Sequence, residues 1–135
     1  MIVLDVCAAI EIASGTPDGK ALENSICEGE TVIVPNYFYI ELSNTLYKCI
    51  RGKAFTAGQA THMLSFIKSI VTSEVKIKEM LPEIISESLQ LKHPTYDIGY
   101  FVLARRNGAT LLTVDKRLAE ICEENRVSAV HFVDL

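Results

Sequence analysis

The stretch HPTYDIGYFVLARRNGATLLTVDKRL, residues 93–118, decides the expected fold because it joins a helix, a strand and the start of a second helix. Thr95 follows a proline and is expected to cap a helix that runs to about residue 107. The apolar run over residues 110–114 predicts a buried strand, and residues 116–124 predict another helix. A short apolar strand between two helices is the unit from which parallel α/β sheets are built.

The same alternation of short apolar runs and helical patterns extends over the rest of the chain. Strands are expected at residues 1–4, 31–34, 75–77 and 129–133, and helices at 7–14, 16–28, 36–51, 56–71 and 82–92. In the helix expected at residues 36–51, the core candidates are Tyr37, Ile40, Leu42, Leu46 and Ile50. No repeat, linker or change of composition divides the chain. We therefore predict an α/β fold: a single three-layer α/β/α domain over residues 1–135 with a mainly parallel central sheet.

The composition is that of a folded globular protein with an acidic balance. Of the 135 residues, 49% are hydrophobic and 22% are charged, which excludes disordered and low-complexity classes. The net charge is −4, whereas proteins held to nucleic acid mainly by charge neutralisation are usually basic. If this protein acts on RNA or DNA, something other than a basic surface must attract the phosphates.

The four cysteines fit neither a zinc pattern nor an exported disulfide framework. Their positions, residues 7, 27, 49 and 122, contain no C-x-x-C pair. The first residues lack the positively charged start of a signal peptide, and no apolar run is long enough to span a membrane. We expect a cytoplasmic protein with reduced cysteines and no membrane partner.

Four carboxylates follow strands or begin helices at matching places in this pattern. Asp5 comes directly after the first strand, and Asp115 comes directly after the strand at residues 110–114. Glu41 lies early in the helix after the second strand, and Asp97 lies in the first turn of its helix. Because right-handed crossovers bring strand ends and the following helix starts to one edge of the sheet, all four are expected to converge.

Each carboxylate alone has an ordinary structural interpretation. Asp115 could cap a helix, and Asp97 could simply stabilise the positive end of a helix dipole. Asp5 is harder to explain, because a carboxylate at the end of a buried strand needs compensation. Four converging carboxylates with no histidine or cysteine expected beside them favour Mg²⁺ or Mn²⁺, and hence a metal-dependent phosphodiesterase or nuclease. His93 could approach Asp97, although most histidines in such positions have no catalytic role.

The segments MIVLD (residues 1–5), VPNYFYIELSNTL (34–46) and the quoted stretch 93–118 together resemble a PIN domain, in particular the VapC-like toxins of prokaryotic toxin–antitoxin pairs. The resemblance implies a PIN-like fold and a metal-dependent endoribonuclease that uses Mg²⁺ or Mn²⁺ and leaves a 5′-phosphate and a 3′-hydroxyl. It also implies a homodimer and a cognate antitoxin partner. The catalytic and metal-binding residues implied are Asp5, Glu41, Asp97 and Asp115, with Asn44 and Thr113 as polar supports.

One departure from the family pattern supports a second hypothesis. PIN domains usually carry hydroxyl residues after the first aspartate, whereas this chain has Val6 and Cys7. The alternative to the toxin ribonuclease is therefore a catalytically weak PIN-like module that binds RNA or a protein.

Two surface features each have two interpretations. Lys48, Arg51 and Lys53 form the densest basic cluster and could guide an RNA backbone, or they could be solvated residues that stabilise a helix end. The adjacent aromatic residues 37–39 cannot all face the core. They could stack on an RNA base, but a dimer or partner surface is the favoured interpretation.

Overall fold

A central parallel sheet organises the computed structural model, which describes residues 1–130. Within these residues, five strands lie in the order β3-β2-β1-β4-β5, and every neighbouring pair is parallel. Their bounds are β1 Ile2–Leu4, β2 Val32–Pro35, β3 Ser73–Val75, β4 Thr110–Leu112 and β5 Ala129–Val130. The three middle strands are apolar and almost wholly buried, as expected for a sheet covered on both faces.

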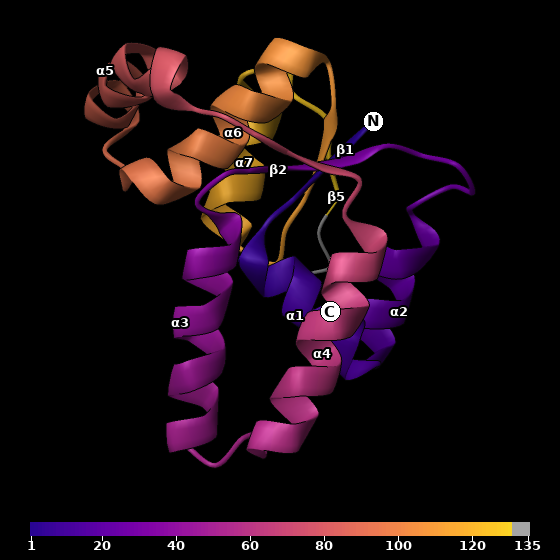
Figure 1. Ribbon diagram of the computed structural model, residues 1–135. Helices are drawn as coiled ribbons and strands as arrows, with labels where there is room; N and C mark the ends of the chain where they lie inside the picture. The colour runs from indigo at the N-terminus through magenta and orange to yellow at the C-terminus, as the bar shows by residue number, and fades with distance from the viewer. Residues whose placement is uncertain (131–135) are drawn as a thin grey trace.

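Helices form the two outer layers, which confirms the predicted α/β/α architecture. They are α1 Val6–Ser14, α2 Pro17–Asn24, α3 Phe38–Arg51, α4 Ala57–Ile70, α5 Leu81–Leu91, α6 Thr95–Asn107 and α7 Lys116–Glu124, with a 3₁₀ turn at Lys78–Met80 before α5. In Figure 1 the helices α1 to α4 lie below the sheet and α5 to α7 lie above it. Right-handed crossovers explain this division, because the chain steps one way across the sheet from β1 through β2 to β3 and the other way from β3 through β4 to β5.

The reversal of strand order places the ends of β1 and β4 side by side. Leu4 is paired with Leu112, so the residues that follow these two strands leave the sheet together. In open α/β sheets this switch point opens a crevice at the carboxyl ends of the strands, which is where ligands bind. The topology therefore brings Asp5 and Asp115 to the same edge.

Helix α6 is buried along most of its length because it has neighbours on several sides. It contacts β1, β2 and β4 of the sheet, and it also contacts α5 and α7. All seven residues from Ile98 to Ala104 are buried. This packing fixes the first turn of α6, and with it Asp97, against the carboxyl edge of the sheet.

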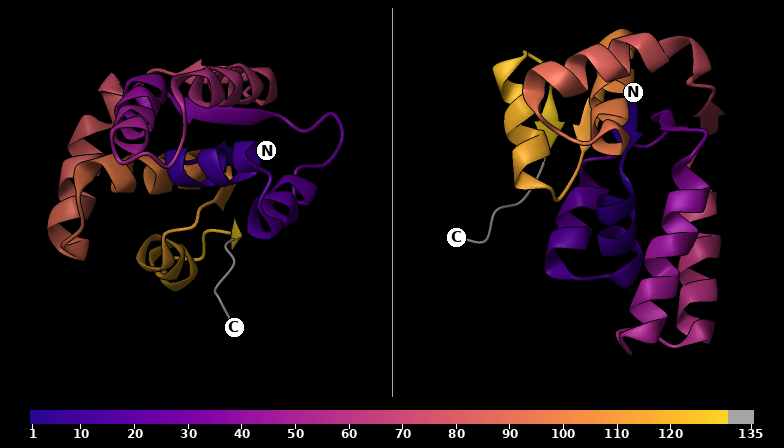
Figure 2. Two further views of the ribbon diagram at one scale, coloured as in Figure 1. Left: turned by 90° about the horizontal axis from the view of Figure 1, so that it is seen from below. Right: turned by 90° about the vertical axis from the view of Figure 1, so that its left-hand side faces the viewer.

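Helices α3 and α4 form a pair that extends away from the sheet (Figures 1 and 2). The turn between them ends at Thr56, whose side chain accepts from the backbone N–H of Gln59, while the Gln59 side chain accepts from the N–H of Thr56. This reciprocal capping box confirms Thr56 as the start of the fourth helix. In α3, Phe38, Leu42 and Leu46 form the buried stripe.

Several expected boundaries and one core residue were wrong. Helix α2 ends at Asn24, four residues early, because Ser25 caps it and turns its hydroxyl back to the carbonyl of Ala21. Thr95 is the first residue of α6 and not its cap, since the carbonyl of Pro94 already accepts the first helical N–H. Ile40 is 72% exposed because it lies two residues, or about 200° of helix rotation, from Phe38.

The two edge strands differ slightly from their expected bounds. The strand after residue 72 lies at Ser73–Val75, slightly earlier than predicted. The last predicted strand is present at Ala129–Val130, and its remaining part, residues 131–133, lies outside the described residues. Among the described residues, no helix combines the length and the apolar character needed to cross a membrane.

Close packing around Gly99 gives a test of this arrangement. The hydroxyl of Tyr37 donates to the carbonyl oxygen of Tyr96 at 2.6 Å, which places the phenol directly against Gly99. A Cβ added at Gly99 would overlap the Tyr37 hydroxyl. We expect Gly99→Ala to lower the free energy of unfolding by about 1–3 kcal/mol, measured by urea denaturation.

The matched control is Gly58→Ala in the first turn of α4. There an added Cβ meets only the Thr56 hydroxyl at 3.9 Å, an ordinary contact. This variant should be neutral or stabilising by up to about 1 kcal/mol, because alanine is the better helix former. Equal stabilities for the two variants would contradict the close contact between Tyr37 and Gly99.

Candidate functional site

Asp5 is the buried member of the acidic group and is held by the backbone of two elements. It ends β1 and caps α1, where its Oδ1 accepts the N–H of Ala8 at 2.8 Å. Its own N–H donates to the carbonyl of Leu112 at 3.2 Å. Only 6% of the residue is exposed. Burial raises the pKa of Asp5 to about 7, with a smaller contribution from the negative charges of Asp97 and Asp115, although hydrogen bonds oppose the shift.

Thr113 connects Asp5 to Asp115. It is fully buried, its hydroxyl is hydrogen-bonded to the Asp5 carboxyl, and the same oxygen accepts the N–H of Asp115 at 3.0 Å. The support role suggested for Thr113 from the sequence stays a prediction. One buried hydroxyl thus fixes the spacing of two carboxylates that come from neighbouring strand ends.

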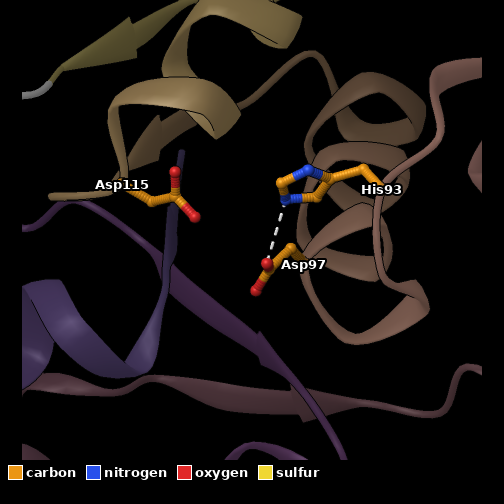
Figure 3. A group of neighbouring side chains, drawn as sticks. All are labelled: His93, Asp97 and Asp115. Atoms are coloured by element: carbon orange, nitrogen blue, oxygen red, sulfur yellow. Dashed lines mark hydrogen bonds and ion pairs between the residues drawn. The ribbon is translucent and has the colours of Figure 1, made fainter.

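Asp97 and Asp115 face one another together with His93 (Figure 3). One ligand atom from each of the three side chains lies within 4.8 Å of the other two. Asp115 caps α7 by accepting the N–H of Leu118 at 3.1 Å, which leaves its second oxygen free of that bond. Burial raises the pKa of Asp97, and the charge of Asp115 acts in the same direction while His93 opposes it.

His93 corrects the expectation of a site made of carboxylates alone. Its Nε2 lies 3.0 Å from Oδ2 of Asp97, and its side chain is only 14% exposed. In the sequence, the proximity of His93 to the site was indicated by its position four residues before Asp97, with Pro94 restricting the backbone between them. Because His93 lies before α6 begins, helical spacing alone could not place its ring.

Glu41 lies on the opposite side of this crevice, in the first turn of α3. The hydroxyl of Tyr100 donates to its Oε1 at 3.1 Å. Burial raises the pKa of Glu41, and the negative charge of Asp97 adds to the effect, whereas the Tyr100 hydrogen bond lowers it. Tyr100 was not identified from the sequence, although its position three residues after Asp97 places both on the same face of α6.

A groove runs outward from Glu41 along α3. It has a volume of about 600 Å³. Its lining residues are Ile40, Glu41, Ser43, Asn44, Tyr47 and Tyr96. The exposed aromatic side chains here are Tyr47 and Tyr96, not the residues 37–39 considered from the sequence, because Phe38 is fully buried and its two neighbours are half-buried.

The residues that replace the usual hydroxyls begin α1. Val6 is buried in the core, whereas Cys7 is exposed. Desolvation of the Cys7 thiol raises its pKa to about 11, and the negative charges of the four candidate carboxylates add to the shift. The thiol therefore stays protonated at neutral pH beside the acidic crevice.

The basic cluster lies away from the acidic residues. Lys48, Arg51 and Lys53 are exposed at the distal end of α3 and in the turn after it. Arg51 is ten residues from Glu41, which corresponds to about 15 Å along the helix axis. Its guanidinium lies 5.8 Å from the ring centre of Tyr47, at the edge of the groove. The three cations therefore lie toward the end of α3 that is remote from Glu41.

The fold and this site define an α/β/α domain with an acidic crevice at the switch point of its sheet. The chain matches the model of the PIN domain family over residues 2–124, and it therefore belongs to that family of nucleases. This finding confirms the resemblance identified from the sequence.

The relatives found include VapC ribonucleases. The chain is 28% identical to Ribonuclease VapC12 of Mycobacterium tuberculosis over 120 residues, which cover 89% of this chain and 91% of the relative. It is 24% identical to Ribonuclease VapC3 of Pyrobaculum aerophilum over 123 residues, 88% of this chain and 92% of the relative. The crystal structure of PAE2754 from Pyrobaculum aerophilum is similar in fold, with a TM-score of 0.68 at 20% identity, and the match covers 88% and 84% of the two chains.

Proposed function

We propose that this protein is a metal-dependent endoribonuclease, the toxin of a VapBC-type toxin–antitoxin pair. The observation that carries the proposal is the convergence of Asp97, Asp115 and His93 beside the buried Asp5 at the switch point. The ribonuclease names of the distant relatives support RNA as the substrate. Hydrolysis would leave a 5′-phosphate and a 3′-hydroxyl.

The donor atoms of the site fit a divalent cation. Burial, and to a smaller extent the negative charges of Asp97 and Asp115, raises the pKa of Asp5, and a cation bound beside these carboxylates would offset both effects. Asp5, Asp97 and Asp115 would hold Mg²⁺ or Mn²⁺, with Glu41 as a further ligand or a water-mediated one. When bound, such an ion supplies positive charge against the phosphate oxygens and lowers the pKa of water.

The chain's own residues position the other participants. Glu41, oriented by Tyr100, lies where it can accept a proton or hold a water, and Asn44 one turn later can donate to a phosphate or ribose oxygen. Thr113 would keep Asp5 and Asp115 at their working separation. Lys48, Arg51 and Lys53 would contact the RNA backbone farther along α3, where they would add affinity without entering the chemistry.

The test is cleavage of a pool of small RNAs by the purified protein, free of antitoxin, with Mn²⁺, with Mg²⁺ and with EDTA. Discrete products that depend on the metal and carry 5′-phosphates support the proposal. Absence of cleavage by folded protein that still binds the metal would favour the second candidate, a PIN-like module that binds RNA or protein. Val6 and Cys7 are the observation behind this alternative, and restoring hydroxyl residues there should then restore cleavage.

We also propose a homodimer, with α5 contributing to its interface. Leu81, Ile85 and Leu89 are all exposed, and their spacing of four residues aligns them along one side of α5. We expect Ile85→Lys to convert the dimer to a monomer, measured by light scattering after size-exclusion chromatography. Gln90→Lys, an equal change of charge on another side of α5, should leave the mass unchanged.

A monomeric wild-type protein would contradict the dimer, and a dimeric Ile85→Lys variant would place the interface elsewhere.

The cognate antitoxin would cover or enter the groove beside Glu41, whose lining combines apolar surface with a carboxylate. Mixing the two proteins should then suppress RNA cleavage.

A further inference from the structure

We propose that the imidazole of His93 is a direct ligand of the divalent cation, which makes this site favour Mn²⁺ over Mg²⁺. The inference deepens the proposed function and rests on it only for the presence of a cation in the crevice. His93 belongs to none of the four carboxylate positions, so it would be an additional donor in this site.

The distance between His93 and Asp97 is that of two ligands of one ion. Two atoms bound about 2.1 Å from a metal and at right angles to each other lie about 3.0 Å apart. Nε2 of His93 is hydrogen-bonded to Oδ2 of Asp97 at this distance, 3.0 Å, and one ligand atom from each of His93, Asp97 and Asp115 lies within 4.8 Å of the other two. The three side chains therefore need little movement to surround one cation.

The backbone holds the imidazole in this place. The N–H of His93 donates to the carbonyl of Ser88 at 3.2 Å, closing the end of α5, and Lys92 before it adopts the left-handed conformation with φ 54°. Pro94 then restricts His93 on the other side. Figure 3 shows the ring directed from this junction toward the two aspartates. A side chain fixed in this way is only 14% exposed and loses little freedom on binding a metal.

The nitrogen donor determines which metal binds better. Mg²⁺ strongly prefers oxygen ligands and releases water reluctantly, whereas imidazole suits transition metals. If the ligands were three aspartates alone, Mg²⁺ and Mn²⁺ would differ only in size and preferred geometry, because both carry the same charge. Adding one imidazole should favour Mn²⁺ by about tenfold or more.

The experiment compares wild type with His93→Gln and uses His62→Gln as the matched control. His62 is exposed in the middle of α4 and belongs to no cluster of candidate ligands among the described residues. Affinities for Mn²⁺ and Mg²⁺ are measured by calorimetry on metal-free protein. Pulsed electron paramagnetic resonance of the Mn²⁺ complex then reports whether a nitrogen-14 nucleus is bound directly to the metal.

We expect nitrogen coupling in wild type and in His62→Gln but not in His93→Gln. The Mn²⁺ affinity of His93→Gln should fall about tenfold or more, while its Mg²⁺ affinity changes less than about threefold. A glutamine can still donate to Asp97, so an unchanged ratio of the two affinities would mean that His93 only orients Asp97, and would overturn the proposal. Absence of nitrogen coupling in wild type would overturn it as well.

These results are independent of RNA cleavage. A protein that shows nitrogen coupling but cuts no RNA retains the metal assignment of His93 and loses the ribonuclease proposal. A protein that cuts RNA without nitrogen coupling retains the ribonuclease and loses the role of His93.

Discussion

Asp97→Asn is expected to abolish metal-dependent RNA cleavage, with a loss of at least about 10²–10³-fold in rate. Asp97 lies in the cluster with His93 and Asp115 and is hydrogen-bonded to His93, so removing its charge disrupts the candidate metal site. The variant keeps the side-chain shape and removes the charge of a carboxyl group whose pKa is raised by burial. The fold should therefore persist, which circular dichroism and thermal unfolding will verify.

The matched control for this variant is Asp18→Asn. Asp18 also lies in the first turn of a helix, but it is exposed at the start of α2, which is separated from Asp5 by the whole of α1. Its cleavage rate should equal that of wild type. Full activity in Asp97→Asn, or equal losses in the two variants, would mean that the acidic crevice is not the catalytic site.

Asp5→Asn is expected to stabilise the metal-free protein at pH 8 while it removes cleavage. The folded protein raises the pKa of Asp5 to about 7, against about 3.9 in an unfolded chain. Between these values the folded state binds a proton that the unfolded state has released, so stability falls as the pH rises from about 4 to 7. The penalty is fully present above pH 7 and amounts to at most about 4 kcal/mol.

Urea unfolding in EDTA at pH 8 and at pH 4 measures this effect. Asparagine carries no charge but can still accept the N–H of Ala8, so Asp5→Asn should gain stability over wild type at pH 8 and little or none at pH 4. Asp18→Asn serves again as the control and should follow wild type at both values. A variant that is less stable than wild type at pH 8 would show that Asp5 has a structural role in place of a functional one.

Adding Mn²⁺ and measuring the melting temperature tests the same carboxylate in the presence of a cation. Mn²⁺ should raise the melting temperature of wild type by mass action, and the rise should be much smaller for Asp5→Asn. If the charge of Asp5 destabilises the metal-free protein and a bound cation offsets that effect, Asp5 behaves as a metal ligand. The same experiment distinguishes a competent site from a degenerate one, which is the question raised by Val6 and Cys7.

The sequence alone determined the fold because each local signal agreed with the same topology. Buried apolar strands, the helix start at Thr56 and the proline at the beginning of α2 all set element limits through local geometry. The placement of carboxylates at strand ends followed from the handedness of crossovers, which depends on chain chirality and not on packing details. These are short-range rules, so one sequence was sufficient.

Only the tertiary structure decided which side chains meet in the crevice and which face solvent. His93 reaches Asp97 through the loop between α5 and α6, and Tyr100 reaches Glu41 across 59 residues of sequence. Ile40 lines a groove in place of the core because the rotation of α3 is set by its buried neighbours. The direction of a side chain depends on packing between distant elements, and no local spacing in the sequence determines it.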